Sequence, residues 1–231
     1  MTPLYEDEDL VVFSKPSGLH VHPTALSLGE DSLLLQAQRD LGYSNLFPVH
    51  RIDRATSGLV MFSKSSEMAA ALNHLLATGK AHKRYLALVR GWCTEPWVGE
   101  GSVRDPWTDK RKEAVTEFFP RKQWELSVPL GRYATCRFSL VEARPLTGRT
   151  HQIRQHLKQV SHPIIGDTRY GNGDQNRFFR DHFGWERLFL HAFALNLLHP
   201  RTGLSLNLSD PIDETSSKLL SKLQQESAPP Q

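Results

Sequence analysis

The sequence predicts a globular chain in which strands and helices are mixed, for two reasons. Of its 231 residues, 39% are apolar and 23% are charged, which is ordinary for a globular protein with a sizeable core. Both secondary-structure periodicities also occur. The apolar run Leu10–Ser14 is typical of a buried strand, whereas Met68, Leu72 and Leu75 fall on one face of a helix. The length suits one large domain or two small ones.

The remaining elements follow from the same patterns along the chain. Strands are predicted over Leu59–Ser63, Lys83–Val89, Tyr133–Ala143, Leu188–Leu198 and Leu204–Leu208, the last two as a hairpin. Helices are predicted over Ser32–Leu41 with Leu34, Leu35 and Leu41 on one face, from an N-cap at Ser66 to Gly79, from an N-cap at Thr150 with Ile153, Leu157 and Val160 toward the core, and over Thr215–Gln225.

The chain shows no feature of a membrane or secreted protein. No apolar run approaches the roughly 20 residues that a membrane-spanning helix needs. The acidic N-terminus lacks the basic and then apolar layout of a signal peptide. The two cysteines, Cys93 and Cys136, form no CxxC pair and are expected to be reduced thiols. We therefore expect a cytoplasmic protein without a membrane partner.

Charge is distributed unevenly, although the net charge is only +3. Residues 1–31 hold six acids and one lysine. Residues 137–158 hold five basic side chains against Glu142 alone: Arg137, Arg144, Arg149, Arg154 and Lys158. Such a segment beside a cleft would attract phosphates, and it would equally suit a solvated face. Charge alone does not decide between the two.

The stretch His50–Lys64, which reads HRIDRATSGLVMFSK, is the one around which the chain is organised. Asp53 stands between Arg51 and Arg54, and arginines within a few ångströms lower the pKa of a carboxyl group. Gly58 permits a tight backbone path and the close approach of a ligand. From the residues alone, a solvated turn with a local ion pair explains the pattern as well as a catalytic site does.

Several motifs resemble those of one enzyme family. The run from His50 to Val60 is similar to the H-R-[IL]-D-x-x-T-S-G-L-[VL] catalytic loop of the RluA-type pseudouridine synthases. Lys83-Arg84-Tyr85 resembles the family's K-x-Y motif, and Thr147–Leu157 resembles T-G-R-x-H-Q-[IL]-R-x-H-[LM]. The segment VVFSKPSGLHVHP resembles the first motif, a turn that we expect to support the catalytic loop. Together the resemblance covers nearly the whole chain.

The resemblance implies an α+β fold, with a mixed, largely antiparallel sheet, flanking helices and a central catalytic cleft. It implies a single pseudouridine synthase catalytic domain over residues 1–231. A separate N-terminal RNA-binding domain, which many relatives carry, is not expected, because the first strand begins within a dozen residues of Met1. A monomer is expected.

The resemblance also assigns residues to a reaction that detaches uracil from its ribose and rejoins it through carbon. Asp53 is the implied catalytic residue, acting after the uridine has flipped out of its stack. Arg51 is implied to fill the vacated space, Tyr85 to meet the uracil, and Arg154 to pair with Asp53. Without the resemblance, Tyr85 is better explained as a core side chain and Arg154 as a solvent-facing helical residue. The reaction needs no cofactor.

RNA is therefore the expected partner, most of all tRNA. The insert Asn172–Arg187 resembles the branch of the family that modifies uridine 65 in the T-stem of tRNA. We expect Arg177 and Arg180 of this insert, together with Arg149, to bind RNA. An rRNA-modifying synthase of the same family is the main alternative. A non-catalytic RNA-binding module would explain the basic stretches but not the three motifs in order.

Two further points concern histidines and tryptophans. His20 and His22 have no third ligand at a recognisable spacing, so no metal site is expected. Residues 92–132 interleave tryptophans with basic side chains: Trp92, Trp97, Trp107 and Trp124 with Arg104, Lys110, Arg111, Lys112, Arg121 and Lys122. This stretch is either an RNA-contacting face or the strands and turns of an irregular sheet, and the sequence does not choose.

Overall fold

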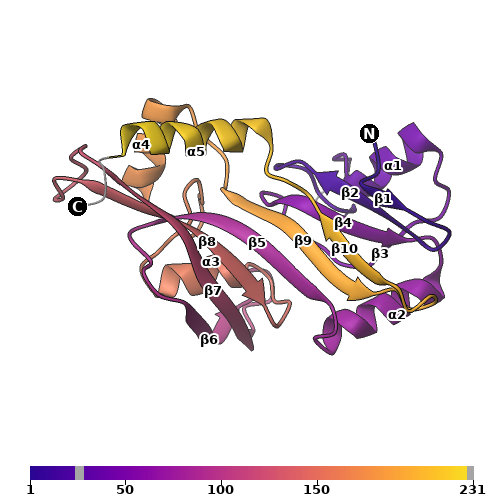
Figure 1. Ribbon diagram of the computed structural model, residues 1–231. Coiled ribbons are helices and arrows are strands. Elements are labelled where there is room, and N and C mark those ends of the chain that lie inside the picture. The colour runs from indigo at the N-terminus through magenta and orange to yellow at the C-terminus, as the bar shows by residue number, and fades with distance from the viewer. Residues whose placement is uncertain (24–28, 228–231) are drawn as a thin grey trace. The chain divides into compact units, whose positions relative to one another are not determined.

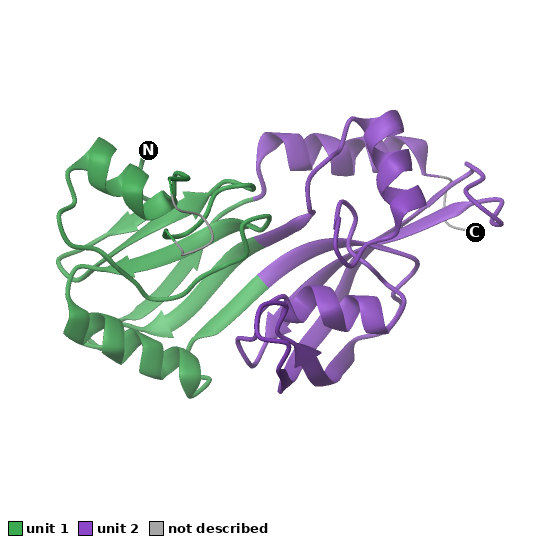
Figure 2. Ribbon diagram, turned by 180° about the vertical axis from the view of Figure 1, so that it is seen from behind, with its two compact units in different colours: residues 1–84, 192–211 green, residues 85–191, 212–231 purple. Residues whose placement is uncertain are grey.

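The computed structural model describes residues 1–23 and 29–227 (Figure 1). The chain forms two compact units, each assembled from two stretches of sequence (Figure 2). Unit 1 comprises Met1–Arg84 and Ala192–Pro211, and unit 2 comprises Tyr85–His191 and Ile212–Gln231. The expectation of a single catalytic domain stays a prediction.

Unit 1 is built on a sheet whose strands follow the order β1-β2-β4-β9, with β3 beside β4 and β10 beside β9. The strands are β1 (Tyr5–Glu6), β2 (Leu10–Lys15), β3 (Phe47–Pro48), β4 (Ser57–Ser63), β9 (Leu190–Leu198) and β10 (Ser205–Ser209). β2 lies antiparallel to β4, with Phe13 opposite Val60. Every residue of β4 is buried, as its continuous apolar run predicts.

Two helices, α1 (Leu33–Leu41) and α2 (Ser66–Ala77), complete unit 1. The α2 face that carries Met68 and Leu72 packs on the sheet, as its spacing predicts. The N-cap of α2 is Ser65 and not Ser66, because the Ser65 hydroxyl accepts from Met68 N. In α1 the predicted face was wrong. Its buried residues are Leu33 and Ala37, which lie four apart on another face, and Leu35 and Leu41 are exposed.

Unit 2 contains four antiparallel strands in the order β5-β8-β7-β6. They are β5 (His82–Arg90), β6 (Trp97–Arg104), β7 (Arg111–Leu126) and β8 (Cys136–Pro145). Most of residues 92–132 therefore form a β-hairpin of the sheet, which is one of the two interpretations that the sequence left open. Trp124 is buried in this hairpin at 2% exposure, whereas Trp107 at its tip is 62% exposed.

Three helices belong to unit 2: α3 (Gln152–Gln159), α4 (Gly173–Phe183) and α5 (Glu214–Glu226). The predicted cap at Thr150 was wrong. His151 precedes α3 in a left-handed conformation with φ 55°, and the Thr150 hydroxyl instead donates to Asp105. Ile153 and Leu157 of α3 are buried as predicted, but Val160 is exposed. The helices α4 and α5 lie side by side (Figure 1), joined by a 2.7 Å contact between His182 and Glu226.

Ten strands and five helices thus occur among the described residues. The predicted α+β class with a largely antiparallel sheet is confirmed. Within the described part of the chain, none of the helices has the length and apolar character needed to span a membrane.

Candidate active site

The predicted catalytic loop connects β3 to β4 in unit 1. Ile52 is buried and anchors the loop in the core, while the flanking Arg51 is exposed and Asp53 is partly exposed. The N–H of Thr56 donates to the carbonyl oxygen of Asp53 at 3.0 Å and closes a turn. Because Thr56 and the following β4 are buried, this turn fixes the backbone at Asp53, a residue that is partly exposed.

The turn after β2 is hydrogen-bonded to the predicted catalytic loop, as expected for the first motif. Arg54 and Gly18 exchange two hydrogen bonds, 2.8 Å from Gly18 N to Arg54 O and 2.9 Å from Arg54 Nε to Gly18 O. The Ser17 hydroxyl donates to Ala55 O at 2.7 Å. The two segments therefore form one hydrogen-bonded unit around Asp53.

Lys15 is the side chain between these two segments, and sequence reasoning missed it as a site residue. It is fully buried, and its Nζ donates to Pro16 O at 2.8 Å, Leu19 O at 2.7 Å and Arg54 O at 3.1 Å. Burial lowers the pKa of Lys15 to about 7, although the nearby Asp53 carboxylate acts in the opposite direction. The K-P-x-G motif was the only signal in the sequence for this role.

This lowered pKa predicts a pH-dependent stability. Between pH 7 and 10.5 the unfolded chain keeps a proton on Lys15 that the folded chain has lost, so the free energy of unfolding rises with pH in this window. The slope of the free energy of unfolding is at most about 1.4 kcal/mol per pH unit. It flattens below about pH 7, where the folded and the unfolded chain both hold the Lys15 proton. Urea unfolding at pH 7, 8 and 9 should show this slope in the wild type and not in Lys15→Met. The exposed Lys222→Met is the control, and an equal slope in all three proteins would contradict the assignment.

Gly58, the second residue of β4, lies where another strand comes very close. Its φ is +113°, and a Cβ added there would lie 2.3 Å from the carbonyl oxygen of Ala192 in β9. The glycine is therefore required by the packing of two strands. The expectation that it makes room for a ligand is not needed to explain it.

His50, at the start of the catalytic motif, is a neutral structural side chain. Burial and the nearby Lys83 lower its pKa to about 3. Its Nε2 accepts from Met61 N at 3.2 Å, which ties the loop to β4. Because that nitrogen is an acceptor, the proton lies on Nδ1.

Tyr85 opens the unit 2 part of β5, opposite Ala143 of β8. Its side chain is 8% exposed, so most of the ring packs inside the protein. The neighbouring Arg84 places its guanidinium 4.8 Å from the ring centroid of Phe193. The predicted contact of Tyr85 with uracil is not tested by this geometry and stays a prediction.

Arg154 is buried on α3 and not solvent-facing, at 6% exposure. Its Nε and Nη2 donate to the two carboxylate oxygens of Asp167, at 2.8 and 2.9 Å. Burial opposes ionisation of Asp167, but the Arg154 contacts and the N–H groups of Tyr170 and Arg169 lower its pKa overall. Asp167 thus orients the Arg154 guanidinium. The predicted pairing of Arg154 with Asp53 stays a prediction.

The motif around Arg149 is positioned by the buried amide of Gln152. Its Nε2 donates to Val115 O and to the Thr116 hydroxyl, both at 2.9 Å. Its Oε1 accepts from Arg149 N at 3.0 Å and from the Thr147 hydroxyl at 2.7 Å. Arg149 itself is exposed and borders a small polar cavity of about 90 Å³.

The predicted RNA-binding residues Arg177 and Arg180 both lie on the exposed side of α4. Each is close to an aspartate of the same helix, Arg177 Nη1 at 3.7 Å from Asp174 and Arg180 Nε at 3.1 Å from Asp181. On the other side of this insert, Phe179 and Trp185 are buried. The insert is therefore structural on its inner face and charged on its outer face.

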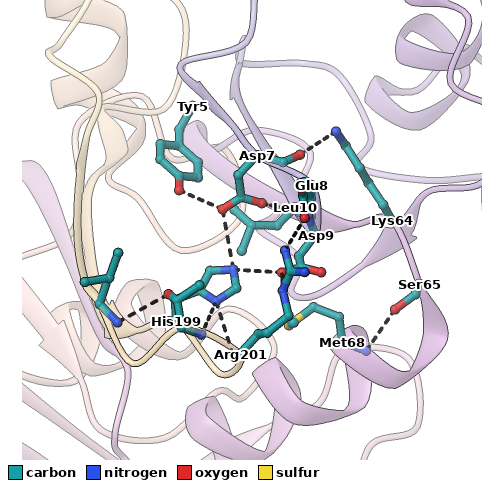
Figure 3. A network of polar contacts seen from close by, with 12 residues as sticks. Tyr5, Asp7, Glu8, Asp9, Leu10, Lys64, Ser65, Met68, His199 and Arg201 are labelled. Carbon is teal, nitrogen blue, oxygen red and sulfur yellow. Dashed lines mark hydrogen bonds and ion pairs between the residues drawn. The ribbon is translucent and has the colours of Figure 1, made fainter.

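A second polar cluster in unit 1 joins three segments that are far apart in sequence (Figure 3). His199 Nε2 lies 3.4 Å from a carboxylate oxygen of Asp7 and equally far from one of Asp9. Arg201 Nε donates to Asp9 at 2.6 Å, and Lys64 Nζ donates to Asp7 O at 2.6 Å. The cluster fastens the acidic N-terminal turn to the hairpin between β9 and β10, which no local sequence pattern indicated.

The donor set of this cluster resembles a metal site but does not fit one. His199 Nδ1 accepts from the N–H groups of Arg201 and Thr202, at 3.2 and 3.3 Å, so Nε2 carries the proton. A metal bound at Nε2 would need the Nε2 lone pair, and the imidazole proton would then have to lie on Nδ1. Nδ1 already accepts two hydrogen bonds, so it does not carry that proton. The two carboxylates are also engaged by Tyr5 and Arg201. His199 is better explained as a structural side chain whose Nε2 faces the carboxylates of Asp7 and Asp9, 3.4 Å from each.

Comparison with known proteins identifies the class. The sequence profile described as RNA pseudouridylate synthase matches residues 9–159. The chain belongs to this family, and the resemblance to the RluA-type enzymes is confirmed. It is an RNA pseudouridine synthase, an isomerase of uridine.

Relatives that are similar to this chain over almost its whole length carry a more specific name. The chain is 39% identical to tRNA pseudouridine synthase C of Vibrio cholerae over 229 residues, which is 95% of this chain and 94% of the relative. It is 38% identical to the protein of that name from Haemophilus influenzae, covering 95% and 96%. The solved structure of human RNA pseudouridylate synthase domain containing 4 shares the fold, with a TM-score of 0.73 at 24% identity, covering 96% and 92%.

Proposed function

We propose that this enzyme acts on tRNA and converts uridine 65 of the T-stem to pseudouridine, with Asp53 as the catalytic residue. The observation that carries the tRNA proposal is the identity of 38 to 40% over about 95% of the chain with relatives named tRNA pseudouridine synthase C. The resemblance of the insert Asn172–Arg187 to that branch supports uridine 65. The partly exposed position of Asp53 on a hydrogen-bonded turn supports its catalytic role.

The proposed reaction begins when the target uridine leaves its stack. Arg51, which is exposed beside Asp53, takes the space of the extruded base. Asp53 then acts on the ribose, either as the nucleophile at C1′ or as the base at C2′. The bond from C1′ to N1 breaks and uracil turns against Tyr85. A bond from C1′ to C5 then forms as the ester between Asp53 and C1′ breaks, or, in the base mechanism, as Asp53 returns the proton to C2′. The C5 proton is released, N1 gains a proton, and no oxidant or cofactor takes part.

Arg154 is proposed to pair with the Asp53 carboxylate and orient it, with Asp167 holding the Arg154 guanidinium in place. Arg154→Lys should lower the single-turnover rate about 100-fold, because lysine lacks the planar two-pronged donor. The affinity for tRNA should change far less. Rapid-quench assays and filter binding measure the two quantities, with Arg187→Lys as a control in another arginine–aspartate pair. Equal losses in rate and affinity would instead make Arg154 a phosphate contact.

Arg149, Arg177 and Arg180 are proposed to contact the RNA outside the target uridine. All three are exposed and lie in unit 2. Since Arg177 and Arg180 each have an aspartate neighbour, their contribution is expected to depend on the shape and phosphate position of the RNA more than on bulk attraction.

Mapping the modified position tests the proposal directly. The purified enzyme is incubated with unmodified tRNA transcripts and with rRNA fragments, each carrying C5-tritiated uridine. Tritium release from tRNA, with pseudouridine mapped to position 65, is the expected result. Release from rRNA alone would overturn the tRNA assignment in favour of the rRNA-modifying alternative. No release from either RNA would overturn the proposed function.

A further inference from the structure

A group of exposed or partly exposed aromatic and arginine side chains lies in unit 2 where β5 ends and β8 begins. We call it the arginine–aromatic patch: Arg90, Trp92, Arg132, Tyr133 and Arg137. The Arg137 guanidinium lies 4.1 Å from the ring centroid of Trp92. The Arg90 and Arg132 guanidiniums lie 5.8 and 5.1 Å from the ring centroid of Tyr133. Trp92 and Tyr133 are 39% and 47% exposed.

The charges of this patch are only partly compensated. Arg137 pairs with Glu125 at 2.9 Å. Arg90 and Arg132 have no acidic partner within 4.0 Å among the described residues, although both approach the same tyrosine ring. The hydrogen bond from Arg132 and the charges of both arginines lower the pKa of Tyr133. The positively charged guanidinium groups of Arg90 and Arg132 both lie near the Tyr133 ring and repel each other. An anion bound between them would reduce that repulsion.

The patch is also held in place before any ligand arrives. The Trp92 indole donates from Nε1 to Trp124 O at 3.2 Å, which fixes the ring on the sheet. Leu130 and Tyr133 exchange two backbone hydrogen bonds, at 2.9 and 3.3 Å, which close the turn that carries Arg132. Rings and cations that are already ordered lose little conformational entropy on binding.

A cavity of about 550 Å³ adjoins the patch through the same turn. Its lining comes from this turn and from α4: Leu130, Gly131, Asp174, Arg177, Phe178, Asp181 and His182. The Phe178 and His182 rings are stacked, with centroids 5.1 Å apart. The turn that carries Arg132 therefore borders the same cavity as Arg177, which sequence reasoning assigned to RNA binding.

We propose that the arginine–aromatic patch binds the sugar–phosphate backbone of the substrate RNA, away from the uridine that reacts. Guanidinium forks match phosphate oxygens, and exposed rings beside them offer stacking surfaces for ribose or an unpaired base. Arg90 lies five residues along β5 from Tyr85, or about 17 Å at the usual strand rise. The patch thus adds affinity without touching the reacting groups. The inference rests on the proposed function only in taking RNA as the substrate.

The test removes the two uncompensated charges and keeps side-chain shape. Arg90→Gln with Arg132→Gln is compared with Arg39→Gln with Lys218→Gln, which removes two charges from α1 and α5, where both are ion-paired. Arg132→Gln alone is included, because Arg132 is exposed on a turn and its loss leaves the fold intact. Fluorescence anisotropy measures the dissociation constant at several salt concentrations, using the RNA that the wild type isomerises.

The patch double variant should bind about tenfold more weakly, and its log–log salt slope should fall by about 2, or about 1 for Arg132→Gln alone. Its single-turnover rate at saturating RNA should equal that of the wild type. Affinity and slope equal to those of the control pair would overturn the proposal, and the patch would then be left to another partner such as an acidic peptide. This result differs from failure of the proposed function, in which the wild type itself releases no tritium from RNA.

Discussion

Asp53→Asn is expected to abolish uridine isomerisation while leaving the fold and the RNA affinity close to those of the wild type. The amide keeps the shape of the carboxyl group but can neither attack C1′ nor accept a proton from C2′. Because Asp53 is partly exposed, its replacement leaves no unpaired group in the core. The single-turnover rate should fall by about 1,000-fold or more, the range for loss of a nucleophile or base.

Tritium release from C5-tritiated tRNA measures this loss, and filter binding and thermal melting measure affinity and fold. Asp40→Asn on α1 is the matched control, since it is an exposed aspartate that the mechanism does not use. Substantial turnover by Asp53→Asn, with Asp40→Asn at the wild-type rate, would remove Asp53 from the reaction. Turnover lost in both variants would point to a general effect of charge.

Gly58→Ala is expected to cause the largest loss of stability among single substitutions at the site. The new Cβ would meet the Ala192 backbone, 2.3 Å from its oxygen, 2.6 Å from its nitrogen and 2.8 Å from its carbonyl carbon. None of these atoms can move without separating β4 from β9. The left-handed backbone adds strain for any residue with a Cβ. We expect the free energy of unfolding to fall by more than about 4 kcal/mol.

Gly42→Ala separates the two causes. Gly42 ends α1 with φ +73°, and a Cβ there would meet nothing within 4 Å. Gly42→Ala should therefore lower the free energy of unfolding only by the cost of the left-handed backbone, about 1 to 2 kcal/mol. Urea unfolding gives both values. Similar losses in the two variants would mean that β9 yields at Ala192, and that the close approach of the strands is not what requires a glycine at position 58.

The order of the motifs and the residue types in them could be predicted from the sequence, because each motif lies within one short stretch of the chain. The continuous apolar run predicted β4, and the spacing of Met68 and Leu72 predicted the buried face of α2. Asp53 stood out because a carboxyl group between two arginines is unusual beside a buried strand. Element ends were less certain. Ser65 rather than Ser66 caps α2, since capping depends on backbone angles that neighbouring serines do not reveal.

Tertiary structure alone decided which polar groups share a site, because their partners are distant in sequence. Arg154 looked like an edge residue of a helix until Asp167 was placed against it by the following turn. Lys15 is buried because Arg54, 39 residues away, supplies one of its three carbonyl acceptors. His199 meets Asp7 across almost the whole chain. Periodicity predicted the buried face of β4 and α2 but not that of α1, whereas the pairing of buried charges depends on contacts that only the folded chain brings together.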